Sequence, residues 1–330
     1  MTFWAYRVEE SEQGMMASWQ QQQLDQLPEG EVLINVEYSS VNYKDALSAN
    51  GNKGVTRSFP HTPGIDVAGT VVSCSSDAFK AGDEVVVFGY DLGMNTFGGF
   101  SQQVRVPAAW VLSRPAGLSA AESMSWGTAG FTAALSVQKL ERNGIHPQAG
   151  PVVVTGATGG VGSVAVALLA KLGYEVLAVT GKPEQQTFLS GLGAKGFLTR
   201  DDILATKGKA MAKPLYQAAV DTVGGDLVSG LIPQIQPEGA VTTCGMIAGQ
   251  SVEASVFPFI LRGVSLLGVD SVEIPASEKQ FVLNKVAGDW QLACLEEMTT
   301  EIGRSQLSEV LAKVLAGQGV GRYRLNLNAE

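Results

Sequence analysis

The first third of the chain alternates between apolar and polar positions over short stretches. Glu31–Tyr38 alternates with a period of two, as a half-buried strand does. Val67–Val72 and Glu84–Phe88 are β-rich stretches bounded by Gly and Asp, and Val104–Val106 directly precedes a proline. Short strands punctuated by glycines predict a small, irregular β-barrel for residues 1 to about 125.

The pattern changes after residue 119. Ser119–Glu122 resembles a helix-capping box, and the small and apolar residues that follow predict two short helices joining two domains. From Gly150 onward, short apolar stretches alternate with helical periodicity, which predicts a doubly wound α/β fold with a parallel sheet. The strands expected there are Val152–Val154, Glu175–Thr180, Gly196–Thr199, Ala218–Asp221 and Ala240–Thr243. Helices are expected at Val161–Leu172, Glu184–Leu192, Leu227–Ile235, Ser277–Lys285 and Leu307–Gly317, with a closing strand at Tyr323–Leu327.

A glycine-rich turn separates the first strand of this part from its first helix. It reads Gly156-Ala157-Thr158-Gly159-Gly160-Val161-Gly162. Gly156 permits a sharp turn, Gly159 leaves room for a pyrophosphate at the backbone, and Gly162 allows close packing of helix and sheet. The helix N-terminus offers free N–H groups to phosphates. Although the spacing is G-x-x-G-x-x-G, its position between a strand and a helix predicts a dinucleotide site rather than a structural turn.

The end of the second strand indicates which dinucleotide is bound. NAD-dependent enzymes usually place Asp or Glu there for the ribose hydroxyls, whereas this chain has Thr180 and Lys182, with Arg200 after the third strand. A hydroxyl and two cations suit the 2′-phosphate of NADPH. The nearby carboxylate of Glu184 is a mild objection to a phosphate site. The alternative is that Lys182 and Arg200 are ordinary solvated surface residues.

Composition narrows the class of partner. The 330 residues carry a formal net charge of -9, so nucleic acid and anionic membranes are unfavourable partners. Three scattered cysteines form no disulfide framework and fit a reducing cytoplasm. The N-terminal residues lack the features of a signal peptide. Pro151–Ala170 has no charged residue, but its four glycines disfavour a membrane helix. We therefore expect a cytoplasmic protein whose partner is a small molecule.

Several motifs in a fixed order resemble the medium-chain dehydrogenase/reductase superfamily, in its zinc-free quinone oxidoreductase division. Besides the glycine turn they are Ser39–Asp45, Pro63–Gly69, Gly98–Phe100, Gly127–Ala133, Asp221–Gly225 and Leu261–Gly268, and together they span nearly the whole chain. Within the division, Asn42–Leu47 and Pro258–Ser271 resemble most the acryloyl-CoA reductase group, whose members are often filed as quinone oxidoreductases.

This resemblance implies a domain organisation and further cofactor contacts. It implies a GroES-like β-barrel catalytic domain, residues 1–122 with 271–330, and a Rossmann dinucleotide-binding domain, residues 123–270. Thr128, Met246 and Val269 would lie along the nicotinamide. Relatives commonly form dimers by pairing the edge strands of their nucleotide domains, which points to residues 256–269 as a homodimer contact.

The residues at the zinc positions of the superfamily argue against a metal. Zinc-dependent members have Cys where this chain has Asn42, and a His-Glu pair where it has Ile65 and Asp66. Zinc requires Cys or His ligands in a tetrahedral site. His61 is the one histidine nearby, and a single histidine more often has a structural role than a metal-binding one. No metal is expected.

Without a Lewis acid, the substrate must accept hydride by itself, as an α,β-unsaturated thioester or a quinone does. Tyr43 is a candidate proton or hydrogen-bond donor, with aromatic packing as the alternative. Asn42 is a candidate to donate its amide N–H to a developing oxyanion. Asp45 is the third candidate catalytic residue, unless it forms a structural pair with Lys44. Asp66 is expected to hold a turn or a cation.

The acceptor remains open between three hypotheses. The first is an NADPH-dependent reductase of a short enoyl-CoA such as acryloyl-CoA, the second an NADPH quinone reductase, and the third an NADPH-binding sensor or structural protein without turnover. Cations available for the phosphates of a CoA ester are Lys53, Arg57, Arg262 and Arg322.

Overall fold

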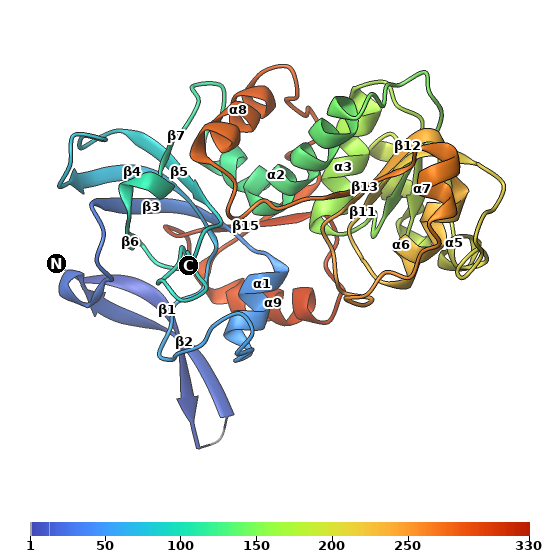
Figure 1. Ribbon diagram of the computed structural model, residues 1–330. Helices are drawn as coiled ribbons and strands as arrows, with labels where there is room; N and C mark the ends of the chain where they lie inside the picture. The colour runs from blue at the N-terminus through green and yellow to red at the C-terminus, as the bar shows by residue number, and fades with distance from the viewer. Residues whose placement is uncertain (1, 13) are drawn as a thin grey trace. The chain divides into compact units, whose positions relative to one another are not determined.

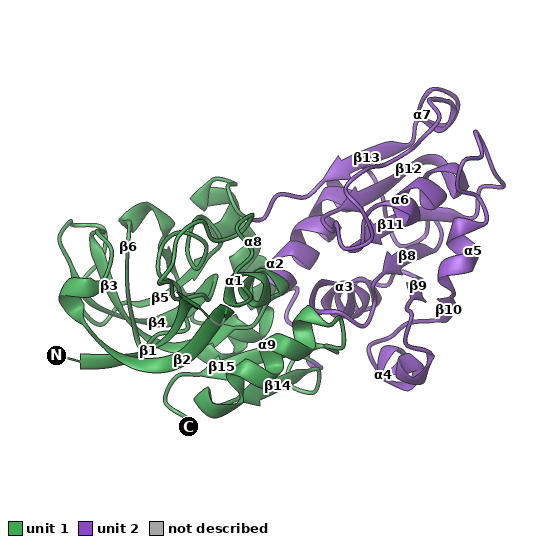
Figure 2. Ribbon diagram, turned by 90° about the horizontal axis from the view of Figure 1, so that it is seen from below, with its two compact units in different colours: residues 1–128, 272–289, 295–330 green, residues 129–271, 290–294 purple. Residues whose placement is uncertain are grey.

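The computed structural model describes residues 2–12 and 14–330. The chain forms two compact units, which Figure 2 colours separately. Unit 1 contains the chain up to Thr128 together with residues 272–289 and 295–330, and unit 2 contains residues 129–271 and 290–294. The long helix α2 (Ala120–Arg142) is interrupted at Gly127, whose φ of 49° and ψ of -168° are not helical, so it consists of two helices. The first boundary between the units therefore lies next to this interruption of the helix, six residues beyond the predicted boundary.

Unit 1 is built around a seven-stranded sheet with the order β14-β15-β3-β4-β5-β7, in which β6 also pairs with β3 (Figure 1). The predicted alternation of β3 is confirmed, because Val32, Ile34 and Val36 all point into the core. The strands of this sheet are β3 (Val32–Ser40), β4 (Asp66–Cys74), β5 (Glu84–Phe88), β6 (Gln103–Val106), β7 (Leu112–Ser113), β14 (Thr299–Ile302) and β15 (Arg322–Asn326). The helices of unit 1 besides the first half of α2 are α1 (Tyr43–Ala49), α8 (Ala276–Ala287) and α9 (Leu307–Leu315).

An N-terminal hairpin, which the sequence did not predict, adds a two-stranded antiparallel sheet to unit 1. It pairs β1 (Thr2–Ser11) with β2 (Gly14–Gln23). Strand β1 buries Phe3, Ala5 and Arg7 along one face. The glutamine-rich β2 has no apolar alternation and little burial, so its pattern alone gives no strand signal.

Unit 2 is a six-stranded, wholly parallel sheet with the order β10-β9-β8-β11-β12-β13, as predicted for a doubly wound fold. Strand β8 is buried throughout, because both faces of a parallel sheet are covered, and its first three residues are valines. The strands are β8 (Val152–Thr155), β9 (Val176–Val179), β10 (Gly196–Leu198), β11 (Tyr216–Asp221), β12 (Ile235–Thr243) and β13 (Ser265–Gly268). The helices besides the second half of α2 are α3 (Gly160–Lys171), α4 (Gln186–Gly191), α5 (Arg200–Leu204), α6 (Asp226–Leu231) and α7 (Phe257–Arg262). Among the described residues, no helix combines the length and apolar character needed to cross a bilayer.

Candidate active site

The glycine-rich turn of unit 2 has the geometry that its sequence predicts. Gly156 leaves β8 with a φ of +58°, where a Cβ would lie 2.5 Å from the Thr222 hydroxyl oxygen. A Cβ on Gly162 would overlap the Gly156 carbonyl oxygen, so the start of α3 packs directly against the turn. Gly159 is the N-cap of α3, and no side chain caps the helix there. Its first backbone N–H groups are therefore available to an anion such as a pyrophosphate.

Polar side chains gather at the end of β9. The Thr158 and Thr180 hydroxyl oxygens lie 3.4 Å apart, and the Lys182 backbone N–H donates to Thr180 Oγ1 over 3.0 Å. Arg200, the first residue of α5, places its Nη2 only 3.0 Å from where a Cβ on Gly181 would stand. The structure thus brings Thr180, Lys182 and Arg200 to one place, whereas Glu184 is exposed on the next turn.

A buried carboxylate joins the strand ends beneath the turn. Asp221, at the end of β11, accepts hydrogen bonds from the Thr155 hydroxyl at 2.7 Å and the Thr243 hydroxyl at 3.1 Å. It also accepts from the Gly224 backbone N–H at 2.8 Å, and burial raises its pKa. Because Thr155 ends β8 and Thr243 ends β12, one side chain aligns three adjacent strands. The sequence motif that contains Asp221 was noted without a role for this residue, since its partners are far apart along the chain.

The two remaining predicted cofactor residues of unit 2 also follow strands of this sheet. Met246 is largely exposed in the loop after β12. Val269 follows β13 and donates its backbone N–H to the Thr243 carbonyl over 3.0 Å. Ligands of doubly wound folds bind at this carboxyl edge of the sheet, so both residues share the edge that carries the glycine turn.

In unit 1, Asp66 is the centre of a buried polar cluster. Its carboxylate accepts the Ser40 hydroxyl, the Asn42 amide at 2.9 Å, and both the backbone N–H and the hydroxyl of Thr128, at 2.7 and 2.5 Å. The antiparallel pairing of β3 with β4 brings Ser40 and Asp66 together. Asp66 therefore holds Thr128, another predicted cofactor contact, at the start of the second half of α2. The buried cation Arg322 also interacts electrostatically with Asp66.

Asn42 occupies the N-cap of α1, and its amide is held inside the polar cluster. Its Nδ2 donates to Ser40 Oγ at 2.8 Å and to Asp66 Oδ2 at 2.9 Å, two acceptors that are hydrogen-bonded to each other and lie on the same side of the amide. Its Oδ1 is buried and has no partner among the described residues. Within the described residues Asn42 thus has a buried acceptor atom without a partner, and its role as a donor to an oxyanion stays a prediction.

Asp45 is fully buried and binds backbone groups. Its oxygens accept the N–H groups of Asn42 at 2.7 Å, Gly64 at 3.2 Å and Ile65 at 2.9 Å, so the alternative pairing with Lys44 is not formed. Burial, followed by the negative charge of Asp66, raises the pKa of Asp45 to about 7. Tyr43, the first residue of α1, is 37% exposed, and its hydroxyl makes no hydrogen bond within the described chain.

Arg322 completes the cluster, although the sequence had offered it only as a cation for CoA. The residue begins β15, which pairs with β3, and its side chain is buried, with 2% exposed. Its Nε donates to the Ser125 carbonyl at 2.9 Å, and its Nη2 is a buried donor with no partner in the described residues. Burial lowers its pKa to about 10, opposed by the charges of Asp66 and Asp45. A buried cation cannot reach CoA phosphates in solvent, so that expectation is wrong.

The other candidate CoA cations are largely occupied. Arg262 donates to the carbonyl oxygens of Pro233, Ile235 and Ala212. Lys53 pairs with Glu10 and lies 4.6 Å above the centre of the Phe59 ring. Arg57 is exposed, and the structure gives its side chain no assigned role.

The positions that hold zinc in metal-dependent relatives carry other chemistry here. Asn42 and Asp66 are engaged with each other, and Ile65 has no ligand atom. His61 is buried between aromatic rings, and burial lowers its pKa to about 4. Within residues 2–12 and 14–330, no group of three or more His, Cys, Asp or Glu side chains is arranged to hold a metal ion.

The raised pKa of Asp45 gives a testable pH dependence. The neutral form is favoured in the folded protein, so this group stabilises the fold at low pH and loses that contribution as the pH rises from about 4 to about 7. We expect the unfolding free energy of the wild type, relative to Asp45→Asn, to fall with increasing pH across this window. Urea unfolding of both proteins at several pH values measures this difference in unfolding free energy. The opposite pH effect of His61 cancels in the difference, because both proteins contain His61. A difference independent of pH would contradict the assignment.

Comparison with known proteins places these features in a family. Residues 28–116 match the family model described as the alcohol dehydrogenase GroES-like domain, and residues 160–287 match the zinc-binding dehydrogenase model. The chain is 44% identical, over 313 residues and 95% of each protein, to the acrylyl-CoA reductase AcuI of Ruegeria pomeroyi.

Two solved structures are similar over essentially their whole length. YhdH of Escherichia coli with bound NADPH has a TM-score of 0.94 at 40% identity, covering 98% of this chain and 100% of that one. YhfP of Bacillus subtilis with NAD bound has a TM-score of 0.96 at 41% identity, covering 99% and 100%. With its GroES-like and Rossmann parts, the chain belongs to the medium-chain dehydrogenase/reductase superfamily, in the quinone oxidoreductase group that includes the acrylyl-CoA reductases.

Proposed function

We propose that the protein catalyses the NADPH-dependent, zinc-independent reduction of the C=C bond of a short α,β-unsaturated acyl-CoA, converting acryloyl-CoA to propanoyl-CoA. The observation that carries the proposal is the 44% identity to an acrylyl-CoA reductase across 95% of both chains. The polar cluster of unit 1 supports it, because Asn42, Ile65 and Asp66 replace the zinc ligands on which alcohol oxidation depends.

The residues of unit 2 fit a bound NADPH. The uncapped start of α3 suits the pyrophosphate, with room left by Gly156, Gly159 and Gly162. Thr180, Lys182 and Arg200 suit a 2′-phosphate, and Thr158, Gly160 and Val161 complete the proposed contacts. When bound, NADPH supplies the hydride that reduces the β-carbon of the substrate.

Three residues of unit 1 have distinct proposed roles. Tyr43 is the candidate donor of the proton to the α-carbon, since its ring is partly exposed and its hydroxyl is not committed elsewhere in the described chain. Asn42 presents Oδ1 as an acceptor, while its amide anchors it to Asp66. Asp45 is a positioning residue, because it fixes the backbone of Asn42 and the segment before β4.

The direct test is NADPH oxidation with acryloyl-CoA beside a water-soluble quinone, in the presence of EDTA. Fast turnover of acryloyl-CoA with slow turnover of quinone supports the proposal. Quinone turnover alone would favour the second candidate function, quinone reduction, which is in keeping with the similarity to quinone oxidoreductases. Tight NADPH binding without either reaction would support a sensor or structural role instead.

The cation pair predicts the cofactor preference. We expect Lys182→Ala combined with Arg200→Ala to raise the KM for NADPH by about tenfold to 100-fold, because two charge-assisted contacts to the 2′-phosphate are lost. The KM for NADH should stay within about twofold, since NADH has no phosphate there. Steady-state kinetics with both cofactors measures the change, and Lys195→Ala, on the preceding loop, serves as a control. Equal losses for NADH and NADPH would contradict the assignment.

We also propose a homodimer formed through the edge of the unit 2 sheet. Strand β13 is the last strand of that sheet, and the adjoining α7 exposes Ile260, at 68%, and Leu261, with its N-cap Val256 also exposed. Exposed apolar side chains beside an unpaired strand edge are a typical subunit contact. A second copy of the chain would cover them by edge-to-edge pairing.

Charge at this surface should prevent the assembly. We expect the wild type to elute as a dimer and Ile260→Glu with Leu261→Glu to be monomeric, because two carboxylates would be desolvated at the contact. Size-exclusion chromatography with light scattering measures the mass, and Phe281→Glu on unit 1 is a control at another exposed apolar residue. A monomeric wild type would refute the dimer.

We further propose a cytoplasmic location, which is supported by the three cysteines, none of which forms a disulfide in the described part of the chain.

A further inference from the structure

The N-terminal hairpin of unit 1 has one edge without a partner strand. On β1, Val8 exchanges two backbone hydrogen bonds with His61, so its N–H and C=O groups point away from β2. Val8 lies opposite Ala17 in the hairpin. In an antiparallel sheet, the two members of such a pair direct their backbone groups to opposite sides. Ala17 therefore presents its backbone groups to the outer edge of β2.

Every second residue of β2 contributes to this edge, which places Met15, Trp19 and Gln21 beside Ala17. The backbone N–H groups of these four residues donate no hydrogen bond in the described part of the chain. No residue of β2 is fully buried, and Figure 1 shows the far end of the hairpin extending beyond the other strands of unit 1. The edge is thus open to solvent along most of its length.

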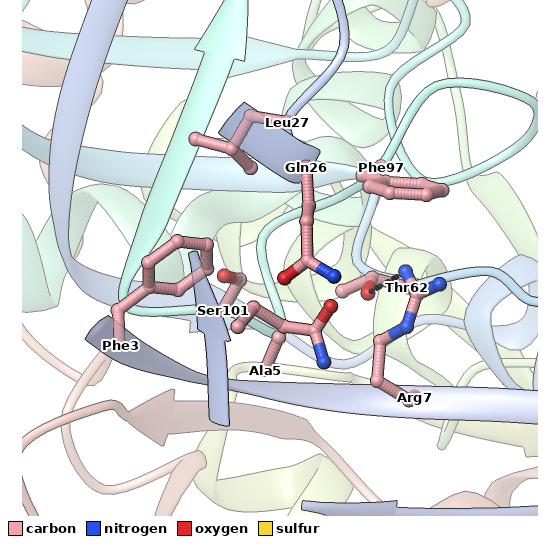
Figure 3. A pocket seen from close by; sticks show the side chains of 9 residues that line it. Phe3, Ala5, Arg7, Gln26, Leu27, Thr62, Phe97 and Ser101 are labelled. Atoms are coloured by element: carbon pink, nitrogen blue, oxygen red, sulfur yellow. Dashed lines mark hydrogen bonds between the residues drawn. The ribbon is translucent and has the colours of Figure 1, made fainter. Parts of the chain in front are cut away.

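Both strands of the hairpin are fixed to the rest of unit 1. Figure 3 shows the Arg7 side chain reaching from β1 toward Thr62, beside the Phe97 ring. Arg7 Nη1 donates to the Thr62 hydroxyl at 3.2 Å, and its guanidinium carbon lies 4.4 Å from the centre of that ring. On β2, the Trp19 indole N–H donates to the Arg304 carbonyl at 2.8 Å. A partner strand would therefore meet an edge that is already ordered, which lowers the entropic cost of pairing.

Strand β2 lacks the features that usually protect a free edge from pairing. Such edges carry charged side chains, proline or a bulge, whereas the ten residues of β2 include neither a charge nor a proline, and their register with β1 is continuous. Like charges that face each other across two strands are destabilising, so an uncharged strand can meet an identical copy without repulsion. The side-chain amides of Gln20–Gln23 both donate and accept hydrogen bonds, which also makes identical strands complementary.

We propose that the outer edge of β2 pairs with the same edge of a second copy of this chain, antiparallel about a two-fold axis at Ser18. Ala17 then lies opposite Trp19 of the second copy. Met15 lies opposite Gln21 of the second copy, and the two Ser18 residues face each other. This register matches each residue that has a free outward N–H group with another such residue.

A register displaced toward the C-terminal end of β2 is less favourable. It would bring Gln23 into the pairing, and the Gln23 N–H already donates to Gln26 Oε1 at 2.7 Å. In the proposed register, Met16, which is 59% exposed, lies opposite Gln20 of the second copy and is partly covered by it. Two strands alone bury less area than a stable interface, so we expect weak, concentration-dependent pairing. The contact is independent of the proposed reductase activity and of the proposed contact at β13.

Ser18→Cys tests the position of the two-fold axis. The two Ser18 residues would form a non-hydrogen-bonded pair with Cα atoms about 4.5 Å apart, a separation that a disulfide can span. We expect mild oxidation to link Ser18→Cys into a dimer on a non-reducing gel. Gln20→Cys, on the same face of β2, is the matched control, because its two copies would lie about 14 Å apart. The wild type controls for the three native cysteines. No linked dimer, or equal linking of Ser18→Cys and Gln20→Cys, would overturn the proposal.

Opposite charges at residue 18 test whether the strand pairs with itself. The parent is Ile260→Glu with Leu261→Glu, so that the proposed β13 contact does not contribute, and sedimentation velocity over a range of protein concentrations measures association. We expect the parent to self-associate, and Ser18→Lys and Ser18→Glu in that parent each to stay monomeric, because like charges would face each other. An equimolar mixture of the two should associate again, since Lys then faces Glu. Circular dichroism checks that each variant is folded. A monomeric parent, single variants that associate as the parent does, or a mixture that stays monomeric would contradict the pairing.

Discussion

Replacing Gly162 by alanine is expected to weaken NADPH binding by about 100-fold or more, which corresponds to about 2.7 kcal/mol. The new Cβ would overlap the Gly156 carbonyl oxygen, and the contact is with backbone, which no side-chain rotation can relieve. The start of α3 must therefore move away from β8, and its N–H groups no longer converge on the pyrophosphate. Fluorescence titration with NADPH measures the dissociation constant directly.

The matched control is Gly191→Ala at the end of α4. A Cβ there would meet no atom within 4 Å, so the substitution should leave NADPH affinity unchanged and the protein equally or slightly more stable. Circular dichroism would establish that Gly162→Ala remains folded. An unaltered NADPH affinity in folded Gly162→Ala would refute the assignment of this turn to the dinucleotide.

The second large effect concerns Arg322. Arg322→Met is expected to reduce the unfolding free energy by about 3 kcal/mol, because Asp45 and Asp66 lose the buried cation that offsets their charge. Urea denaturation at pH 8, where the raised pKa of Asp45 no longer keeps it neutral, measures the loss. At pH 5 the loss should be smaller, since Asp45 is then protonated.

A double-mutant cycle isolates this electrostatic contribution from packing. Asp45→Asn removes one of the two negative charges, so adding it to Arg322→Met should cost less than the sum of the two single changes. Arg105→Met, half-buried on another strand of the same sheet, is the control for removing an arginine. Strict additivity, or an equal loss at pH 5 and pH 8, would mean that Arg322 acts through packing alone.

Local sequence determined the elements that depend on short-range patterns. The alternation around Val32–Val36 predicted β3, and the apolar Val152–Val154 with the glycines behind it predicted β8, the turn and α3. These features could be predicted because each glycine is required by residues close to it in the sequence. Gly156 has a positive φ, and Gly162 packs against the Gly156 carbonyl oxygen. The hairpin of β1 and β2 was not readable, because β2 has almost no buried residues to mark its face.

The tertiary structure alone decided how the polar side chains pair. Arg322 reaches the cluster only because β15 pairs with β3, and β3 with β4 then brings Asp66 to Ser40 and Asn42. Sequence identified Asn42 as a candidate but not the hydrogen bond that anchors its amide, since Asp66 lies 24 residues away along the chain. The chain thus specified by itself which residues it offers to the pyrophosphate of a dinucleotide, because that part of the proposed site is one continuous turn. The charge balance of the unit 1 cluster depends on β15, which is far from β3 and β4 along the chain, and only the pairing of these strands fixes it.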